Sequence, residues 1–157
     1  MYFLGADPGF TGALALYHPA TGDLTIMDMP VVKNPKGRTE LNLHALHTML
    51  TPPAGVKIKA LVEYVASRPN QGAPAMFRFG QGYGALQMAI VAHKIPIEYV
   101  TPTKWKKHFG LSSDKGVSRG LASQRFPNNA SEFVRVKDDG RAEAALIALY
   151  ASLQVAG

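Results

Sequence analysis

Apolar residues occur along the chain in short blocks separated by polar turns, which is typical of strands followed by helices. Five segments have the length and composition of strands: 2–7, 12–17, 24–29, 58–65 and 95–100. The first three are separated only by short turns rich in Pro and Gly, so we expect them to form an antiparallel meander. The continuous apolar run of the fourth predicts a strand that is buried on both faces.

Five further segments are expected to be helices: 41–50, 74–94, 103–109, 114–126 and 138–155. The segments 30–39 and 128–132 are expected to be loops. This order predicts an α/β domain over residues 1–157, with a five-stranded mixed sheet flanked by helices. Three antiparallel N-terminal strands would be followed by two parallel ones.

The composition is that of a globular chain, with 157 residues, 46% hydrophobic and 18% charged. Lys and Arg number 17 against 11 Asp and Glu, and the net charge of +6 favours a polyanionic partner, nucleic acid first. Ordinary solubility charge is the alternative. The absence of cysteine excludes disulfides and thiolate metal sites. No apolar run has the roughly 18–20 residues of a membrane span, and no signal peptide is recognisable. A cytoplasmic location is expected.

Four acidic residues lie where predicted elements end or begin. Asp7 closes the first strand, Glu63 ends the apolar run of the fourth, and Asp139 and Glu143 lie four apart on one face of the last helix. Carboxylates at buried positions are costly unless compensated, and divalent metal ions are a common compensation. Each acid also has a structural alternative. Asp7 suits a turn, Glu63 suits an ion pair with Arg or Lys, and Asp138 suits a helix N-cap.

Three motifs carry a family resemblance: Gly-Ala-Asp-Pro-Gly-Phe-Thr-Gly at 5–12, Leu-Val-Glu-Tyr at 61–64 and Lys-Asp-Asp-Gly-Arg-Ala-Glu-Ala-Ala-Leu-Ile-Ala at 137–148. Together they resemble the RuvC-type Holliday junction resolvases, most closely the RuvC-like proteins of bacteriophages. The resemblance implies an RNase H-like fold, a homodimer that cuts four-way DNA junctions, and two Mg²⁺ or Mn²⁺ ions per active site. The implied catalytic and metal-binding residues are Asp7, Glu63, Asp139 and Glu143.

The spacing of the last two acids departs from the family pattern. Cellular members space this pair three residues apart, whereas Asp139 and Glu143 are four apart and Asp138 is five from Glu143. Asp138 and Asp139 therefore both remain candidates for the third metal ligand.

The resemblance implies an endodeoxyribonuclease that leaves 5′-phosphate and 3′-hydroxyl ends and acts in the bacterial host cytoplasm if phage-encoded. No small-molecule cofactor and no membrane partner are expected. One alternative is an RNase H-fold nuclease for other branched or hybrid substrates. Another is a fragment of an actin-like phosphotransferase, because residues 7–12 resemble the first phosphate loop of that class. The second phosphate motif of that class is missing.

Basic residues supply the candidate DNA contacts, which we expect at Arg68, Arg78, Lys104, Lys106, Lys107, Lys115 and Arg119. The resemblance places Lys106 and Lys115 near the scissile phosphate, and a solvated helix face is the alternative. Trp105 is expected in the core. In several relatives an aromatic residue enters the junction from the position that Ala66 occupies here. Tyr64, Phe77 and Phe79 are candidate substitutes, although helix core is the expected role of Phe77 and Phe79. The helix 74–94 packs either on the sheet or against a second subunit.

Overall fold

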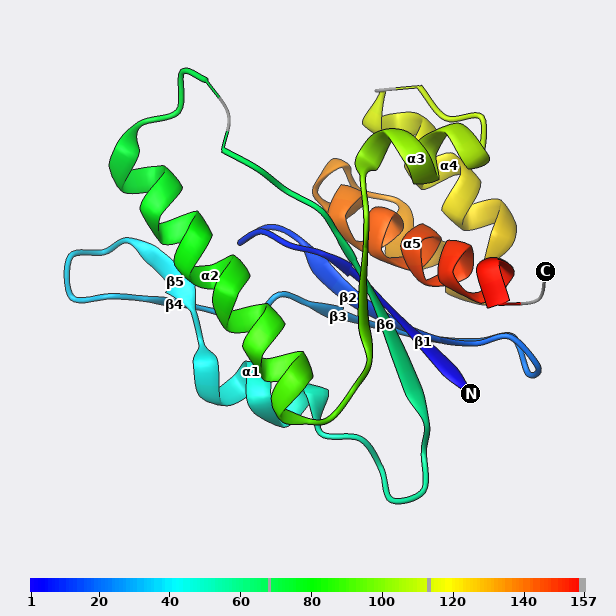
Figure 1. Ribbon diagram of the computed structural model, residues 1–157. Coiled ribbons are helices and arrows are strands. Elements are labelled where there is room, and N and C mark those ends of the chain that lie inside the picture. Colours follow the sequence, from blue (N-terminus) through cyan, green and yellow to red (C-terminus); the bar gives the residue numbers. More distant parts are fainter. Residues whose placement is uncertain (68, 113, 156–157) are drawn as a thin grey trace.

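A computed structural model describes residues 1–67, 69–112 and 114–155, apart from the side chain of Lys115. Its main sheet has the strand order β3-β2-β1-β6-β7 (Figure 1). These strands are β1 (Tyr2–Asp7), β2 (Ala13–His18), β3 (Asp23–Asp28), β6 (Ile58–Glu63) and β7 (Ile97–Val100). The first three pair antiparallel, whereas β6 and β7 run parallel to β1. The predicted five-stranded mixed sheet is therefore confirmed.

Helices cover both faces of this sheet (Figure 1). One face carries α1 (Leu43–Leu50) and α2 (Ala73–Ala92), and the other carries α5 (Asp139–Val155) with α3 (Pro102–His108) and α4 (Lys115–Arg125). Among the described residues, none of the helices combines the length and the apolar composition that crossing a bilayer needs.

Alternation along β1 divides the core between these two layers. Phe3 belongs to the apolar cluster formed with α5, whereas Leu4 and Ala6 belong to the cluster formed with α1 and α2. Side chains of a strand point to opposite faces in turn, so the residue between Leu4 and Ala6 faces α5. That residue is Gly5.

Gly5 allows α5 to lie directly against the backbone of β1. A methyl group at this position would lie 2.2 Å from the carbonyl oxygen of Ala144 and 2.4 Å from the backbone nitrogen of Ala148. Both atoms belong to α5, so neither can be displaced by a side-chain rotation. The close approach fixes how far the residues of α5 stand from the end of β1, and this distance matters for the site.

Two segments that were expected to be loops are ordered elements. Residues 30–39 contain most of a hairpin of β4 (Val31–Lys33) and β5 (Thr39–Leu41). The loop prediction was wrong because each strand is only three residues long, too short for alternation to register. Leu41 consequently belongs to a strand, and Asn42 caps α1 by accepting a 3.1 Å hydrogen bond from the backbone N–H of Ala45.

The second segment, 128–132, lies within a 3₁₀ helix, η1 (Pro127–Phe133), which begins at a proline. A further short 3₁₀ helix, η2 (Val136–Asp138), leads directly into α5. Such short turns carry no apolar periodicity that a sequence pattern can detect.

Candidate metal centre

Two of the predicted site acids end neighbouring parallel strands. Asp7 is the last residue of β1 and Glu63 is the last residue of β6. The strands pair in a register that sets Ala6 beside Val62, so the two acids emerge at the same edge of the sheet. Adjacent parallel strands bring their carboxyl ends together in this way, and ligands commonly bind at such edges.

The turn after Asp7 leaves room for the start of α5. The backbone of this turn passes so close to Asp7 that a methyl group at Gly12 would lie 2.0 Å from the Asp7 carbonyl oxygen. On the facing helix, a methyl group at Gly140 would lie 2.6 Å from the carbonyl oxygen of Thr11 and 3.1 Å from Oδ2 of Asp7. Two glycines therefore permit the first turn of α5 to lie against the Asp7 carboxylate.

Glu143 completes the cluster from α5. One carboxylate oxygen from each of Asp7, Glu63 and Glu143 lies within 4.8 Å of the others. Glu63 and Glu143 are buried, at 7% and 8% exposure, and Asp7 is half-buried. The three acids come from positions 56 and 80 residues apart in the chain, so only folding brings them together.

Two consecutive residues of α3 contact two of these acids. The indole Nε1–H of Trp105 donates a 2.8 Å hydrogen bond to Oε2 of Glu63. The ammonium of Lys106 lies 2.9 Å from Oε1 of Glu143 and 5.2 Å from the centre of the Trp105 ring. Trp105 is fully buried, which confirms its predicted place in the core. Its hydrogen bond to Glu63 was not predicted, because a tryptophan between two lysines is the only sign of it in the sequence.

The donor set of this cluster fits a divalent metal. Three carboxylates held this close repel one another, and cations relieve the repulsion. Carboxylate oxygens are the ligands that Mg²⁺ and Mn²⁺ prefer, whereas zinc sites favour His and Cys. Within the described residues, this cluster is the group of acidic and histidine side chains whose spacing suits an ion.

The fourth predicted acid is not part of that cluster. Asp139 is the first residue of α5, and its Oδ1 accepts a 2.8 Å hydrogen bond from Nε of Arg119 on α4. Arg119 also donates to the carbonyl oxygen of Val134 at 3.1 Å. Arg119, a candidate DNA contact, therefore forms an ion pair with Asp139, a candidate metal ligand.

Asp138, the alternative third ligand, has a structural role. It is 1% exposed, and it accepts hydrogen bonds from both the backbone and the guanidinium of Arg135. Arg141 approaches it at 4.0 Å. The hydrogen bonds from Arg135 hold the pKa of Asp138 below its ordinary value, against the opposing effect of burial. These contacts close the short η2 helix ahead of α5.

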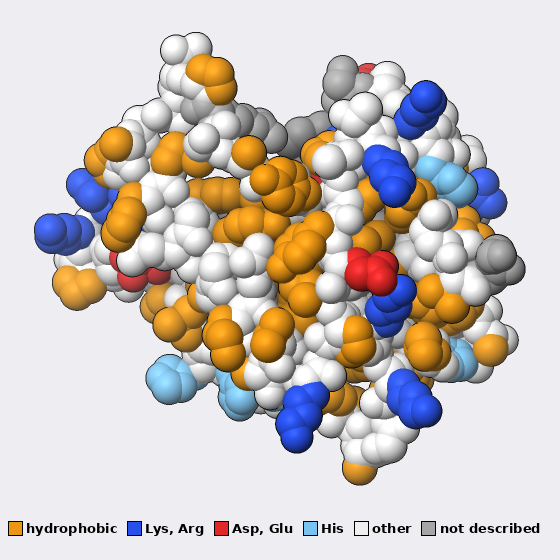
Figure 2. Space-filling model, in the orientation of Figure 1, with side chains coloured by type: hydrophobic (Ala, Val, Ile, Leu, Met, Phe, Trp, Pro, Cys, Tyr) orange, Lys and Arg blue, Asp and Glu red, His pale blue; other side chains and the backbone are white. Residues whose placement is uncertain are grey.

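The other predicted DNA contacts have different surroundings. Lys104 and Lys107 are exposed on α3, and Arg78 is half-buried on α2. Arg68 and the side chain of Lys115 lie outside the described part of the chain. Figure 2 shows Lys and Arg side chains over the region of α3 and along the edge of the β4–β5 hairpin.

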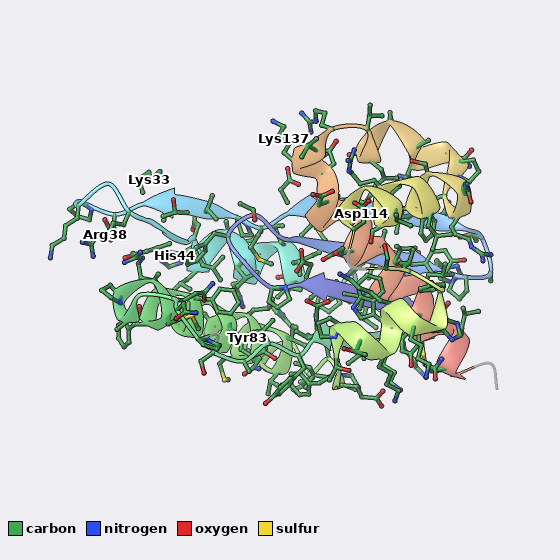
Figure 3. All side chains as sticks on the ribbon, turned by 90° about the horizontal axis from the view of Figure 1, so that it is seen from above. Lys33, Arg38, His44, Tyr83, Asp114 and Lys137 are labelled. Carbon is green, nitrogen blue, oxygen red and sulfur yellow. The ribbon has the colours of Figure 1, made fainter. Side chains whose placement is uncertain are left out.

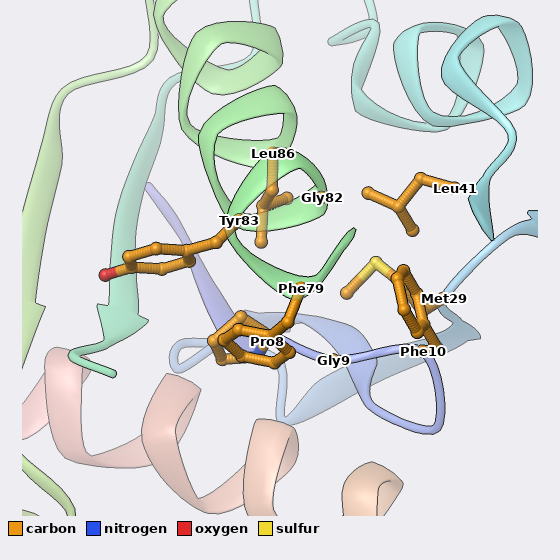
Figure 4. A pocket seen from close by; sticks show the side chains of 9 residues that line it. All are labelled: Pro8, Gly9, Phe10, Met29, Leu41, Phe79, Gly82, Tyr83 and Leu86. Carbon is orange, nitrogen blue, oxygen red and sulfur yellow. The ribbon is translucent and has the colours of Figure 1, made fainter. Parts of the chain in front are cut away.

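The expectation that Phe77 is helix core was wrong, because it is 68% exposed. Phe79, two residues later, lines an apolar pocket with Pro8, Tyr83 and Leu86 (Figure 4). The two phenylalanines lie on different faces of α2 because they are only two residues apart.

Comparison with known proteins shows a likeness of structure. No protein-family model matches the chain, and no curated protein sequence matches it. A structure of Thermus thermophilus RuvC in complex with a Holliday junction substrate matches with a TM-score of 0.65 and 15% identity, over 99% of this chain and 95% of that one. A second Thermus thermophilus RuvC structure matches with a TM-score of 0.55 and 19% identity, over 98% and 97% of the two chains. The chain therefore has the RNase H-like fold of RuvC.

Proposed function

We propose that this protein is a metal-dependent DNA endonuclease that resolves four-way junctions by paired symmetric nicks. The observation that carries the proposal is the meeting of Asp7, Glu63 and Glu143 within 4.8 Å at one edge of the sheet. The RuvC-like fold supports it, and one of the RuvC structures is described in complex with a Holliday junction substrate. The net charge of +6 suits a DNA substrate.

The carboxylates of this cluster are the proposed ligands of two Mg²⁺ or Mn²⁺ ions. Such ions, when bound, activate a water molecule and neutralise charge on the leaving 3′ oxygen. Asp7 and Glu63 hold their oxygens from rigid strand ends, and Glu143 holds its oxygens from a helix that packs on β1. The proposed products carry 5′-phosphate and 3′-hydroxyl ends.

Asp139 is proposed as the fourth acid of the site. It lies one helical turn before Glu143, on the same face of α5. Its partner Arg119 is itself a proposed phosphate contact, so DNA offers Arg119 another anion in place of Asp139. Asp138 is less suited to bind a metal because Arg135 already occupies both of its oxygens.

Lysines close to the cluster are the proposed phosphate contacts. Lys106 pairs with Glu143 and is 20% exposed, so its flexible stem lets the ammonium turn toward a bound phosphate. Lys104 and Lys107 flank it on α3. The remaining proposed contacts with the DNA backbone are Arg68, Arg78, Lys115 and Arg119.

A homodimer is proposed because two symmetric cuts need two active sites. The exposed face of α2 supports this, since Met88 and Val91 are 61% and 49% exposed. At Gly80 and Gly84 an added methyl group would meet none of the described atoms within 4 Å, so another backbone has room to approach. These residues recur at the spacing of one helix face.

Three further proposals rest on the sequence alone. We propose a single nuclease domain over residues 1–157, an origin among the bacteriophage RuvC-like proteins, and action in the cytoplasm of a bacterial host. The motifs at 5–12, 61–64 and 137–148 support the second of these.

One experiment tests the proposal directly. Labelled four-way, Y-shaped, linear and RNA–DNA hybrid duplexes are incubated with the protein and Mg²⁺ or Mn²⁺, and the cuts are mapped. We expect paired symmetric nicks in the four-way DNA, and none with the Asp7→Asn variant. Cutting confined to hybrid or Y-shaped substrates would contradict junction resolution while keeping a nuclease.

A further inference from the structure

The β4–β5 hairpin has an ordered tip. Oδ1 of Asn34 accepts hydrogen bonds from the backbone N–H groups of Lys36 and Arg38, at 2.9 and 3.0 Å. Its amide nitrogen donates to Oε1 of Glu40 at 2.6 Å. The backbone of Gly37, which has a φ of 72°, returns a hydrogen bond to the Asn34 carbonyl oxygen. These hydrogen bonds therefore order the backbone of the hairpin tip.

The charge of this tip is mainly positive. Lys33, Lys36 and Arg38 are exposed, and Figure 3 shows Lys33 and Arg38 on the part of the hairpin that projects from the body of the protein. Lys33 donates to a neutral group, the hydroxyl of Thr39, at 2.6 Å. Across the described ranges, none of these three cations forms an ion pair. Their charges are therefore available to an anion.

A groove separates the hairpin from the first turns of α2. It is open to solvent, and it is lined by Lys36, Arg38 and Glu40 on one side and by Phe77 and Arg78 on the other. Three cations, Lys36, Arg38 and Arg78, and one acid, Glu40, border the groove. Glu40 accepts a hydrogen bond from the side-chain amide of Asn34. Such a basic hollow favours a polyanion.

The groove and the carboxylate cluster share one framework. Leu41 of β5 and Phe79 and Gly82 of α2 line the small apolar pocket against Pro8 to Phe10, the turn that follows Asp7 (Figure 4). A methyl group at Gly82 would lie 3.3 Å from the Phe10 ring and 3.5 Å from Leu41. Both walls of the groove are thus packed against the turn that begins at the site.

We propose that this groove binds the sugar–phosphate backbone of the DNA substrate outside the position that is cut. The inference rests on the proposed function, and it adds a second anchoring surface built by the hairpin. Long, exposed Lys and Arg side chains on an ordered hairpin suit the DNA backbone, because its phosphates carry charge at regular intervals. A stable protein interface instead needs buried apolar anchors, and Phe77 is the one large apolar side chain exposed on this groove.

The test compares a double variant, Lys36→Ala with Arg38→Ala, with a matched control, Lys57→Ala with Lys94→Ala. The control removes two exposed lysines at the far end of α2, about 30 Å away for a 20-residue helix. The affinity for labelled four-way DNA is measured by fluorescence anisotropy over a series of NaCl concentrations. No divalent metal is added, so that no strand is cut.

Each lost phosphate contact lowers the slope of log affinity against log salt by about 0.9. We expect the groove variant to lose about two units of slope and at least about tenfold in affinity near 0.1 M salt, and the control to match wild type. A groove variant with wild-type slope, while the wild type binds and cuts junctions, would overturn this inference alone. A wild type that binds no DNA would overturn the proposed function as well.

Discussion

The indole of Trp105 donates its N–H to Oε2 of Glu63 across a distance of 2.8 Å, in the core beneath the carboxylate cluster. Trp105 is fully buried and Glu63 is 7% exposed, so water does not compete for this hydrogen bond. The next residue, Lys106, contacts Glu143. One short helix therefore orients two acids that come from a strand and from another helix.

Replacing Trp105 with Phe is expected to weaken metal binding. The ring is kept and the N–H is lost, so Glu63 loses the hydrogen bond from Trp105 that orients its carboxylate. Loss of such a supporting hydrogen bond typically lowers metal affinity or activity about 10- to 100-fold. Mn²⁺ titration by calorimetry and single-turnover cleavage both measure the effect.

The control for this variant is Phe133→Leu, which perturbs another buried aromatic ring of the same core cluster. It is expected to lower the melting temperature with little change in Mn²⁺ affinity. Equal losses of Mn²⁺ affinity in both variants would reduce the role of Trp105 to packing.

Neutralising the clustered acids is expected to separate binding from cleavage. Asp7→Asn, Glu63→Gln and Glu143→Gln remove metal ligands and also reduce the repulsion of phosphate. We expect cleavage of four-way DNA to fall at least about a hundredfold while affinity for the junction stays within a few-fold. Gel cleavage assays and anisotropy report the two quantities.

The matched control is Glu98→Gln, because Glu98 is an exposed acid on β7 that pairs with Lys59. Its cleavage rate should equal that of wild type. Undiminished cutting by all three cluster variants would refute the assignment of the site.

Changing Asp139 to Asn is expected to affect cleavage, whereas changing Asp138 to Asn is expected to affect stability. Asp139→Asn removes the proposed fourth ligand and should lower cleavage. Asp138→Asn breaks the hydrogen bonds from Arg135 and should lower the free energy of unfolding at neutral pH, with cleavage by the remaining folded protein preserved.

The pH dependence of stability provides a second measurement on Asp138. Its pKa is depressed below the ordinary 3.8 in the folded protein, so ionised Asp138 stabilises the fold fully above about that pH. This contribution is lost as the pH falls through the depressed folded value. The difference in unfolding free energy between wild type and Asp138→Asn should therefore shrink in denaturant titrations below pH 3.8. A difference that stays constant would argue against the ion pair.

Gly5→Ala is expected to destabilise the protein because the added methyl group meets backbone atoms of α5 that cannot rotate away. The cost should be about 3 kcal/mol, at the upper end for overpacking, and Glu143 should move from Asp7 and Glu63. Gly120→Ala is the contrasting variant, because a methyl group there meets nothing described within 4 Å. It should raise the free energy of unfolding by up to about 1 kcal/mol. Urea denaturation compares the two, and equal effects would disprove the backbone contact.

The sequence by itself determined the five strands of the main sheet, most helices and four candidate acids, three of which meet in the folded chain. Asp7 and Glu63 can be predicted as site residues because each ends a clear apolar run, and neighbouring parallel strands bring such ends together. The helix α5 can be predicted from the sequence because apolar side chains recur along it. The hairpin at 31–41 was not readable, because its strands are three residues long.

Only the tertiary structure decided which acids share a cluster and what holds them. Asp139 is four residues from Glu143, yet Arg119 of another helix binds it, and no pattern along the chain predicts that ion pair. The partners of Glu63 and Glu143 come from α3, about 40 residues from each. Local spacing fixes which face of an element a side chain occupies. Contacts between elements depend on how closely the backbones pack, which here Gly5 and Gly140 set.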